Sequence, residues 1–347
     1  MNSQSKFIHM KILKKYNLFT SGTLLLLMIL FGVSSVNAQS SQTGEGINSP
    51  YNIIGFVQQQ YVDDRTPNIP AGFSIHRARV GLTGSITDNL RVRVLGGFVE
   101  PPQNNPQLLH AHMDYRINPL LTIRAGQFLL PFGIEGYEGI PLNPSIERST
   151  AVRRLNTFRM FSDVGVQASG NLSRINYAVA LVNGTGANQA EQMNLKDVIG
   201  RVGVELADNF EIGLSGHAGN YQPVQDPDND QARYRAGIDM EYSGDPVFFR
   251  GEFITRNDHQ PDSETITMNG GYILGGLAIT DRLEGITRFE YFTPNTDANN
   301  NRYVGYTVGA NYYFVGRTRL SVNYEFRDDE MNPDIGNMLT VQMQIVL

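Results

Sequence analysis

Four arginines are concentrated in one irregular stretch of the chain, residues 131–161. They are Arg148, Arg153, Arg154 and Arg159, and three glutamates share the stretch, Glu135, Glu138 and Glu147. The planar guanidinium group of arginine donates two parallel hydrogen bonds to a phosphate or carboxylate. Rows of arginine in a pore favour anions by the same electrostatics. The residues therefore make this stretch a candidate anion-binding constriction.

A second set of arginines lies in the segments that flank this stretch. Five of them would extend a positive track from the constriction: Arg77, Arg79, Arg91, Arg93 and Arg124. A structural interpretation stands beside this one, because arginines on a polar face often pair with acids and stiffen a wall. Acids are available on predicted polar faces of later segments, among them Asp239, Glu252 and Glu290. For each wall arginine both interpretations stay open.

The segments that carry these arginines alternate between apolar and polar residues with a period of two. In residues 78–86 and 90–98 the apolar side chains fall on one face, and Arg79, Arg91 and Arg93 fall on the other. In residues 109–117, Leu109, Met113 and Ile117 are expected on the apolar face and His110, His112 and Asp114 on the polar face. This period is typical of β-strands with one apolar face.

The connections between these strands alternate in length along the whole chain. Short turns such as Thr87-Asp88-Asn89 are built on Asp and Asn, whose side chains bond nearby backbone. Longer polar connections separate them, at 63–72, 100–106, 131–161, 183–196, 221–231, 257–264, 294–301 and 328–336. Short periplasmic turns and long external loops are typical of outer-membrane barrels. The register through the turn after Ile117 also places Asp114 opposite Arg124, as a cross-strand ion pair.

The sequence thus predicts an all-β protein, an up-and-down antiparallel transmembrane β-barrel of about 16 strands. Its first strand lies near residues 51–62, and the C-terminal strand closes on it. A lipid-facing arginine costs about 2–4 kcal/mol at the bilayer midplane. The arginine face must therefore point into a water-filled lumen. A secreted β-sandwich shares the alternation and the turns, but it does not explain why nearly every strand has only one apolar face.

The N-terminal residues are predicted to be an export signal. Residues 1–38 combine four lysines, an apolar run and a small-residue cleavage site, which is typical of a secretory signal peptide. Polar residues 39–50 are expected to be a flexible leader, and residues 51–347 the barrel, with 131–161 as its constriction loop. Removal of the four lysines changes the net charge from −6 to −10. The predicted location is the outer membrane of a Gram-negative cell, in contact with its lipid.

Three sequence blocks resemble the phosphate-selective porin O and P family. They are F-S-I-H-R-A-R-V-G-L-T-G-S-I-T-D-N-L from Phe73, D-Y-R-I-N-P-L-L-T-I-R-A-G-Q-F-L-L-P-F-G from Asp114, and I-E-R-S together with S-D-V-G-V-Q-A-S-G, which ends at Gly170. The resemblance implies a trimeric porin of sixteen strands. It also implies that the third extracellular loop folds inward and that the pore favours phosphate or other small anions. The family is expected to use lysines as well as arginines, and Lys196 is the only lysine of the predicted mature chain.

Other functions were weighed against a porin. The chain has no cysteine, and its six histidines do not form a recognisable triad, so we expect no enzyme such as an outer-membrane lipase or protease. His110 and His112 lack further assignable ligands, so we expect no metal. We also expect no cofactor and no nucleic-acid partner. A general non-selective porin and a nonconducting structural or adhesion barrel remain alternatives.

The arginines of the stretch yield a direct prediction. Replacing Arg153 and Arg154 by Ala should lower the anion preference of the pore, because two positive charges leave the constriction. The measurement is the reversal potential in a salt gradient across a planar bilayer, and an unchanged value would contradict the prediction.

Overall fold

The protein is described by a computed structural model that covers residues 51–101, 105–156, 158–191, 195–221, 231–259 and 265–347. The predicted signal peptide, 1–38, and the predicted leader, 39–50, lie outside the described residues. Those two assignments stay predictions.

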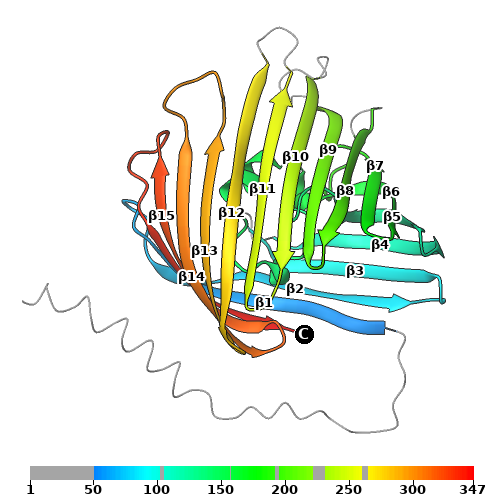
Figure 1. The fold of residues 1–347 in the computed structure, drawn as a ribbon, viewed down its shortest axis with the longest axis horizontal. Coiled ribbons are helices and arrows are strands. Elements are labelled where there is room, and N and C mark those ends of the chain that lie inside the picture. The colour runs from blue at the N-terminus through cyan, green and yellow to red at the C-terminus, as the bar shows by residue number, and fades with distance from the viewer. Residues whose placement is uncertain (1–50, 102–104, 157, 192–194, 222–230, 260–264) are drawn as a thin grey trace, which may run out of the picture. The chain divides into compact units, whose positions relative to one another are not determined.

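Within the described residues, sixteen strands form one closed barrel. Each strand is hydrogen-bonded to its neighbours in sequence, and β1 is paired with β16, so the sheet has no free edge. Figure 1 shows the strands following one another in the order of their colours. The strands are β1 Tyr51–Asp64, β2 Gly72–Ser85, β3 Leu90–Val99, β4 Gln107–Asn118, β5 Leu121–Leu129, β6 Ser162–Leu172, β7 Ile175–Val182, β8 Asp197–Ala207, β9 Phe210–Tyr221, β10 Gln231–Ser243, β11 Val247–Asp258, β12 Ile266–Thr280, β13 Leu283–Thr293, β14 Tyr303–Val315, β15 Thr318–Asp329 and β16 Met338–Val346. This confirms the predicted fold class.

The two faces of the strands differ as the alternation predicts. On β14, Val308 is 55% exposed on the outer face, whereas Thr307 beside it is 2% exposed and points inward. On β15, Phe326 is exposed, whereas Arg319 is buried inside the barrel. An apolar outer band and a polar interior are the properties of an outer-membrane barrel.

The register of β4 against β5 also follows the prediction. Asp114 lies opposite Arg124, and the Arg124 guanidinium donates two hydrogen bonds to the carboxylate, at 2.7 and 3.0 Å. A bidentate pair of this kind fixes the geometry as well as the register.

The prediction that Leu109 lies on the outer face is wrong. The register between β3 and β4 shifts, with Leu95 opposite His110 and Gly96 opposite Leu108, so Leu109 is an extra residue. Such a bulge reverses the side-chain alternation on one strand. Leu108 is therefore exposed on the outside, and Leu109 is buried on the lumen side.

The long connection between β5 and β6 contains residues 131–161, the predicted constriction loop, and that name is used below. It contains the 3-10 turn Ile140–Leu142, the helix α2 Thr150–Leu155 and the 3-10 turn Arg159–Phe161. Ser149 caps α2, since its side chain accepts a hydrogen bond from the Val152 N–H at 3.2 Å. In the described part of the chain, no helix has the length and apolar character needed to cross a membrane.

The outer face makes a testable prediction at Val308. Replacing it by Arg should destabilise the folded barrel in lipid by roughly 2–4 kcal/mol, because a guanidinium would enter the hydrocarbon layer. Reversible urea unfolding in lipid vesicles measures this, with Val308→Leu as the control. Equal stability of the Arg and Leu variants would contradict the assignment of this face.

Candidate functional site

The constriction loop crosses the lumen and is hydrogen-bonded to the inner wall. At its start, the Gly133 N–H donates to Ser215 Oγ of β9 at 3.0 Å, and the Glu135 N–H donates to Glu252 Oε1 of β11 at 2.7 Å. Glu252 is also bonded by the hydroxyl of Tyr272 at 2.9 Å. These bonds to distant strands confirm that the predicted loop folds inward.

The middle of the loop is attached further round the barrel. The Asn143 carbonyl accepts a hydrogen bond from Arg319 of β15 at 2.5 Å, and the Pro144 carbonyl accepts one from Asn311 of β14 at 2.9 Å. Thr150 donates its N–H and its hydroxyl to the Glu290 carboxylate of β13, at 3.0 and 2.9 Å. Because the strands supply side chains and the loop supplies mainly backbone groups, the wall dictates the path of the loop.

An apolar cluster fills the space between α2 and the wall. Leu155 is completely buried, and a buried leucine contributes about 1.5–3 kcal/mol. The cluster includes Phe132, Ala151, Val152, Leu155 and Phe158 of the loop, and Ile199, Ile254, Leu274 and Phe292 of the strands. This packing occupies the part of the lumen next to β8 and β11–β13.

A cavity of about 1310 Å³ lies between the loop and the wall formed by β16 and β1–β5; it is called the passage below. Along β1 it is lined from Ile54, near the turn end, to Val62, near the loop end. At 3.3 Å per residue these eight steps span roughly 26 Å of strand.

The lining of the passage is positively charged. Among the described residues it includes eight arginines and three glutamates, a balance of five positive charges with histidines neutral. The arginines are Arg77, Arg79, Arg93, Arg124, Arg148, Arg153, Arg159 and Arg317, and the glutamates are Glu100, Glu138 and Glu147. Of the nine arginines expected from the sequence, seven line the passage and two, Arg91 and Arg154, do not.

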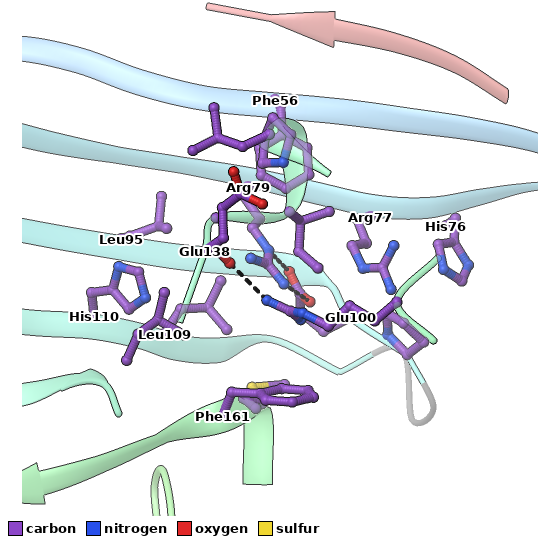
Figure 2. Close-up of a pocket in the computed structure, with 18 of the residues that line it drawn as sticks. Phe56, His76, Arg77, Arg79, Leu95, Glu100, Leu109, His110, Glu138 and Phe161 are labelled. Carbon is purple, nitrogen blue, oxygen red and sulfur yellow. Dashed lines mark hydrogen bonds and ion pairs between the residues drawn. The ribbon is translucent and has the colours of Figure 1, made fainter. Parts of the chain in front are cut away.

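Three of these arginines are held by carboxylates. Arg79 makes two hydrogen bonds to Glu100, at 2.5 and 2.7 Å, which Figure 2 shows as dashed lines. Arg77 makes two hydrogen bonds to Glu147 of the loop, both at 3.0 Å. Arg124 is the third, through its pair with Asp114. Their charge is largely compensated, as the structural interpretation expects.

Arg93 differs from these three. None of the ion pairs between described residues includes it, and its buried Nε has no hydrogen-bond partner there. Its neighbour across the strands is His112, which also lines the passage. Among the wall arginines that line the passage, Arg93 is therefore the one whose charge is least compensated by direct contact.

Arg148 is fixed by backbone groups rather than by an acid. Its Nε donates to the Glu135 carbonyl at 2.5 Å, one Nη donates to the Glu138 carbonyl at 2.8 Å, and its guanidinium lies 4.2 Å from the Phe161 ring centroid. Burial lowers the pKa of Arg148 to about 10. The group still carries its charge at neutral pH.

The loop glutamates have opposite electrostatic environments. Burial would raise the pKa of the Glu147 carboxyl, but Arg77 and His76 outweigh burial and hold that pKa well below its usual range. Burial raises the pKa of the Glu135 carboxyl, and this effect is larger than the opposing effect of the positive charge of Arg288. Glu147 therefore neutralises part of the positive lining.

The remaining predicted residues differ in position. Arg153 is exposed, lines the passage and donates to Thr150 Oγ1 at 3.2 Å, and Arg159 lies in the 3-10 turn at the end of the loop. Arg154 is exposed away from the passage, and Arg91 is exposed at the turn end of β3.

Sequence reasoning missed three residues of the lining. Arg317 follows Gly316 in the short turn between β14 and β15, and His76 contacts Glu147 at 2.7 Å. Phe161 enters the passage from the loop. None of them stands out by spacing, because the contacts that bring them to the passage are long-range.

Several known proteins that are similar to this chain are described as porins or outer-membrane proteins. The model of the family described as putative beta-barrel porin-2, OmpL-like, matches residues 87–346. A curated relative, an uncharacterized protein from Aquifex aeolicus strain VF5, is 24% identical over 269 residues, covering 68% of this chain. The alignment spans 58% of the length of that relative.

Solved structures show the same fold at low identity. The anion-selective porin from Comamonas acidovorans has a TM-score of 0.68 and 12% identity, covering 86% of this chain and 99% of its own. The trimer form of OmpT from Vibrio cholerae has a TM-score of 0.67 and 10% identity, with coverage of 86% and 99%. Salmonella typhi OmpF in complex with daunomycin has a TM-score of 0.63 and 13% identity, covering 86% and 97%. Membership of the phosphate-selective porin O and P family stays a prediction.

The anchor at Glu252 can be tested. Replacing Glu252 by Leu leaves the buried Glu135 N–H without an acceptor, which costs about 1–3 kcal/mol, so the loop should loosen. We expect noisier single-channel current and faster proteolysis within the loop. Tyr272→Phe is the control, because it removes the other bond to Glu252 and keeps the bond to the loop. Equal behaviour of the two variants would contradict this role of Glu252.

Proposed function

Because the chain belongs to the putative beta-barrel porin-2, OmpL-like family, we propose that this outer-membrane barrel is a porin whose passage favours small anions. Family and fold point to a channel rather than an enzyme. The observation that supports anion preference is the lining of the passage, where eight arginines stand against three glutamates among the described residues. Charged lining residues in a pore select by electrostatics, and arginine suits oxyanions.

The predicted mature chain is acidic, and this is compatible with an anion-favouring passage. Acids such as Glu252 and Glu290 lie under the loop, where they bind its backbone, and neither lines the passage. A permeating ion responds mainly to the charges near its path, because salt screens exposed charges beyond about 8–10 Å. The charge of the lining therefore matters more than the charge of the whole chain.

Phosphate is the permeant anion that the sequence resemblance implies, and we propose it as one of the anions that the passage favours. Its tetrahedral oxygens match the two parallel donors of a guanidinium such as that of Arg93. The chain departs from the expected family pattern in lining the passage with arginine and no lysine among the described residues. The preference for phosphate over chloride therefore needs a direct competition experiment.

Assembly and export complete the proposal. One similar structure is described as a trimer form, and we propose a homotrimer in the outer membrane of a Gram-negative cell. The predicted signal peptide, 1–38, would direct export, and the barrel would begin after the leader, 39–50.

A general, non-selective porin is the second candidate. The observation that favours it is the pairing of Arg77, Arg79 and Arg124 with carboxylates, which cancels part of the positive lining. The difference between the two candidates rests on the remaining arginines, of which Arg93 is the clearest. A nonconducting structural or adhesion barrel, the third alternative, would carry no ion current.

Arg93 and Arg91 form a matched pair for the test. Both are arginines of β3, two residues apart, but only Arg93 lines the passage. Arg93→Ala should lower the chloride-to-potassium permeability ratio roughly two- to fivefold, because one charge near the path contributes on the order of 1 kcal/mol. Arg91→Ala should leave the ratio unchanged.

The measurement is the reversal potential in a potassium chloride gradient across a planar bilayer, followed by titration with phosphate. Equal ratios for the two variants would favour the non-selective porin. A wild-type protein that prefers potassium would overturn the proposal of anion preference.

A further inference from the structure

Phe161 has a backbone conformation that bulky residues rarely adopt. Met160 and Phe161 have φ angles of 57° and 58°, consecutive residues in the left-handed region. A residue in this region is strained and persists only where surrounding contacts impose the conformation. Here the Phe161 carbonyl accepts a hydrogen bond from the Leu130 N–H at 2.9 Å, and the Phe161 N–H donates one to the Phe158 carbonyl at 3.1 Å.

This conformation places the Phe161 ring at the passage. The side chain is half-buried and lines the cavity, and Figure 2 shows it at the edge of the group of lining residues. The guanidinium of Arg148 lies against the ring, and it is itself held by two backbone carbonyls. Because this cation already interacts with the ring, a second cation near the ring would be repelled. The fixed aromatic surface therefore suits a solute that is not a cation.

The barrel wall of the same passage combines apolar side chains with nitrogen atoms that have no hydrogen-bond partner in the described structure. Leu95 and Leu109 line it, and Leu109 does so only because of the bulge in β4. His110 follows Leu109 and is 7% exposed, and its Nδ1 has no hydrogen-bond partner in the described structure. Arg93, whose Nε is also unpartnered there, lies on the adjacent strand. Figure 2 shows Leu95, Leu109 and His110 grouped on this wall.

We propose that the passage contains a binding site for organic anions with a flat apolar body, such as aromatic carboxylates. Arg93 and His110 bind the carboxylate, and Phe161 contacts the ring. This rests on the proposed function, since the site lies in the passage of the same porin. Inorganic phosphate has no apolar part, so contact with Phe161 would give it no advantage. An aromatic acid offers a carboxylate to Arg93 and to the N–H tautomer of His110, and a ring to the apolar lining.

The probes are benzoate and acetate, which share a carboxylate and differ in the ring. Benzoate should reduce the chloride current of the wild-type channel in a saturable way at concentrations where acetate has little effect. Aromatic contacts of this kind change affinity roughly five- to tenfold. Calorimetry with the purified protein in detergent gives a second readout of benzoate binding that does not depend on conduction.

Two variants of Phe161 test the contribution of its ring separately from that of its backbone conformation. Phe161→Asn keeps a residue that tolerates positive φ but removes the ring, and it should weaken benzoate binding five- to tenfold. Phe161→Tyr keeps the ring and should stay within about twofold of the wild type. Chloride conductance should persist in both, and the heat-dependent mobility shift of folded barrels on gels confirms folding.

The outcomes distinguish this inference from the proposed function. If the wild type prefers chloride over potassium but benzoate and acetate compete equally, the aromatic site is refuted and the anion porin stands. If the wild type shows no anion preference, the proposed function fails, and calorimetry then decides the site by itself. Equal loss of benzoate binding in the Asn and Tyr variants would also refute a role for the ring.

Discussion

The structure depends on one constraint, the cost of placing a charged side chain in lipid. A barrel with an apolar outer band must direct its guanidinium and carboxylate groups inward. The lumen consequently collects most of the charge of the wall, as buried Arg319 of β15 and Glu290 of β13 illustrate. Such groups are stable only if they are paired, hydrogen-bonded or in water. The internal organisation of the barrel is a solution to that requirement.

The constriction loop binds the charged side chains of the wall on one side of the lumen and leaves those on the other side at the passage. Its backbone N–H groups bind carboxylates of the wall, such as Glu252 and Glu290, and its carbonyls accept hydrogen bonds from Arg319 of β15 and Arg288 of β13. On that side the polar groups of loop and wall satisfy one another, and α2 adds apolar packing. On the side of β1–β5 fewer acids are available, so the lining stays positive. A negatively charged chain thereby encloses a positively charged passage.

Local sequence patterns were sufficient to predict the barrel, but they were insufficient to predict how the residues of the candidate site are paired. Alternation and turn spacing gave the strands, the inward arginine face and the Asp114–Arg124 pair, because each depends on residues close in sequence or on one register. The sequence could not show that Arg79 is paired and Arg93 is not, since Glu100 comes from a loop. Leu109 was misplaced because a single bulge reverses the alternation, and nothing in its own segment announces one.

Three departures from local rules lie at the passage. The bulge at Leu109, the left-handed backbone at Phe161 and the burial of Arg148 without an acid each cost stability, and all three residues line the passage. Natural proteins tend to break local rules at functional sites and to compensate for them elsewhere. The β-barrel supplies that compensation here, because its closed hydrogen-bonded ring and the anchored loop hold strained residues in place. These three residues support the proposal that the passage is shaped for a solute.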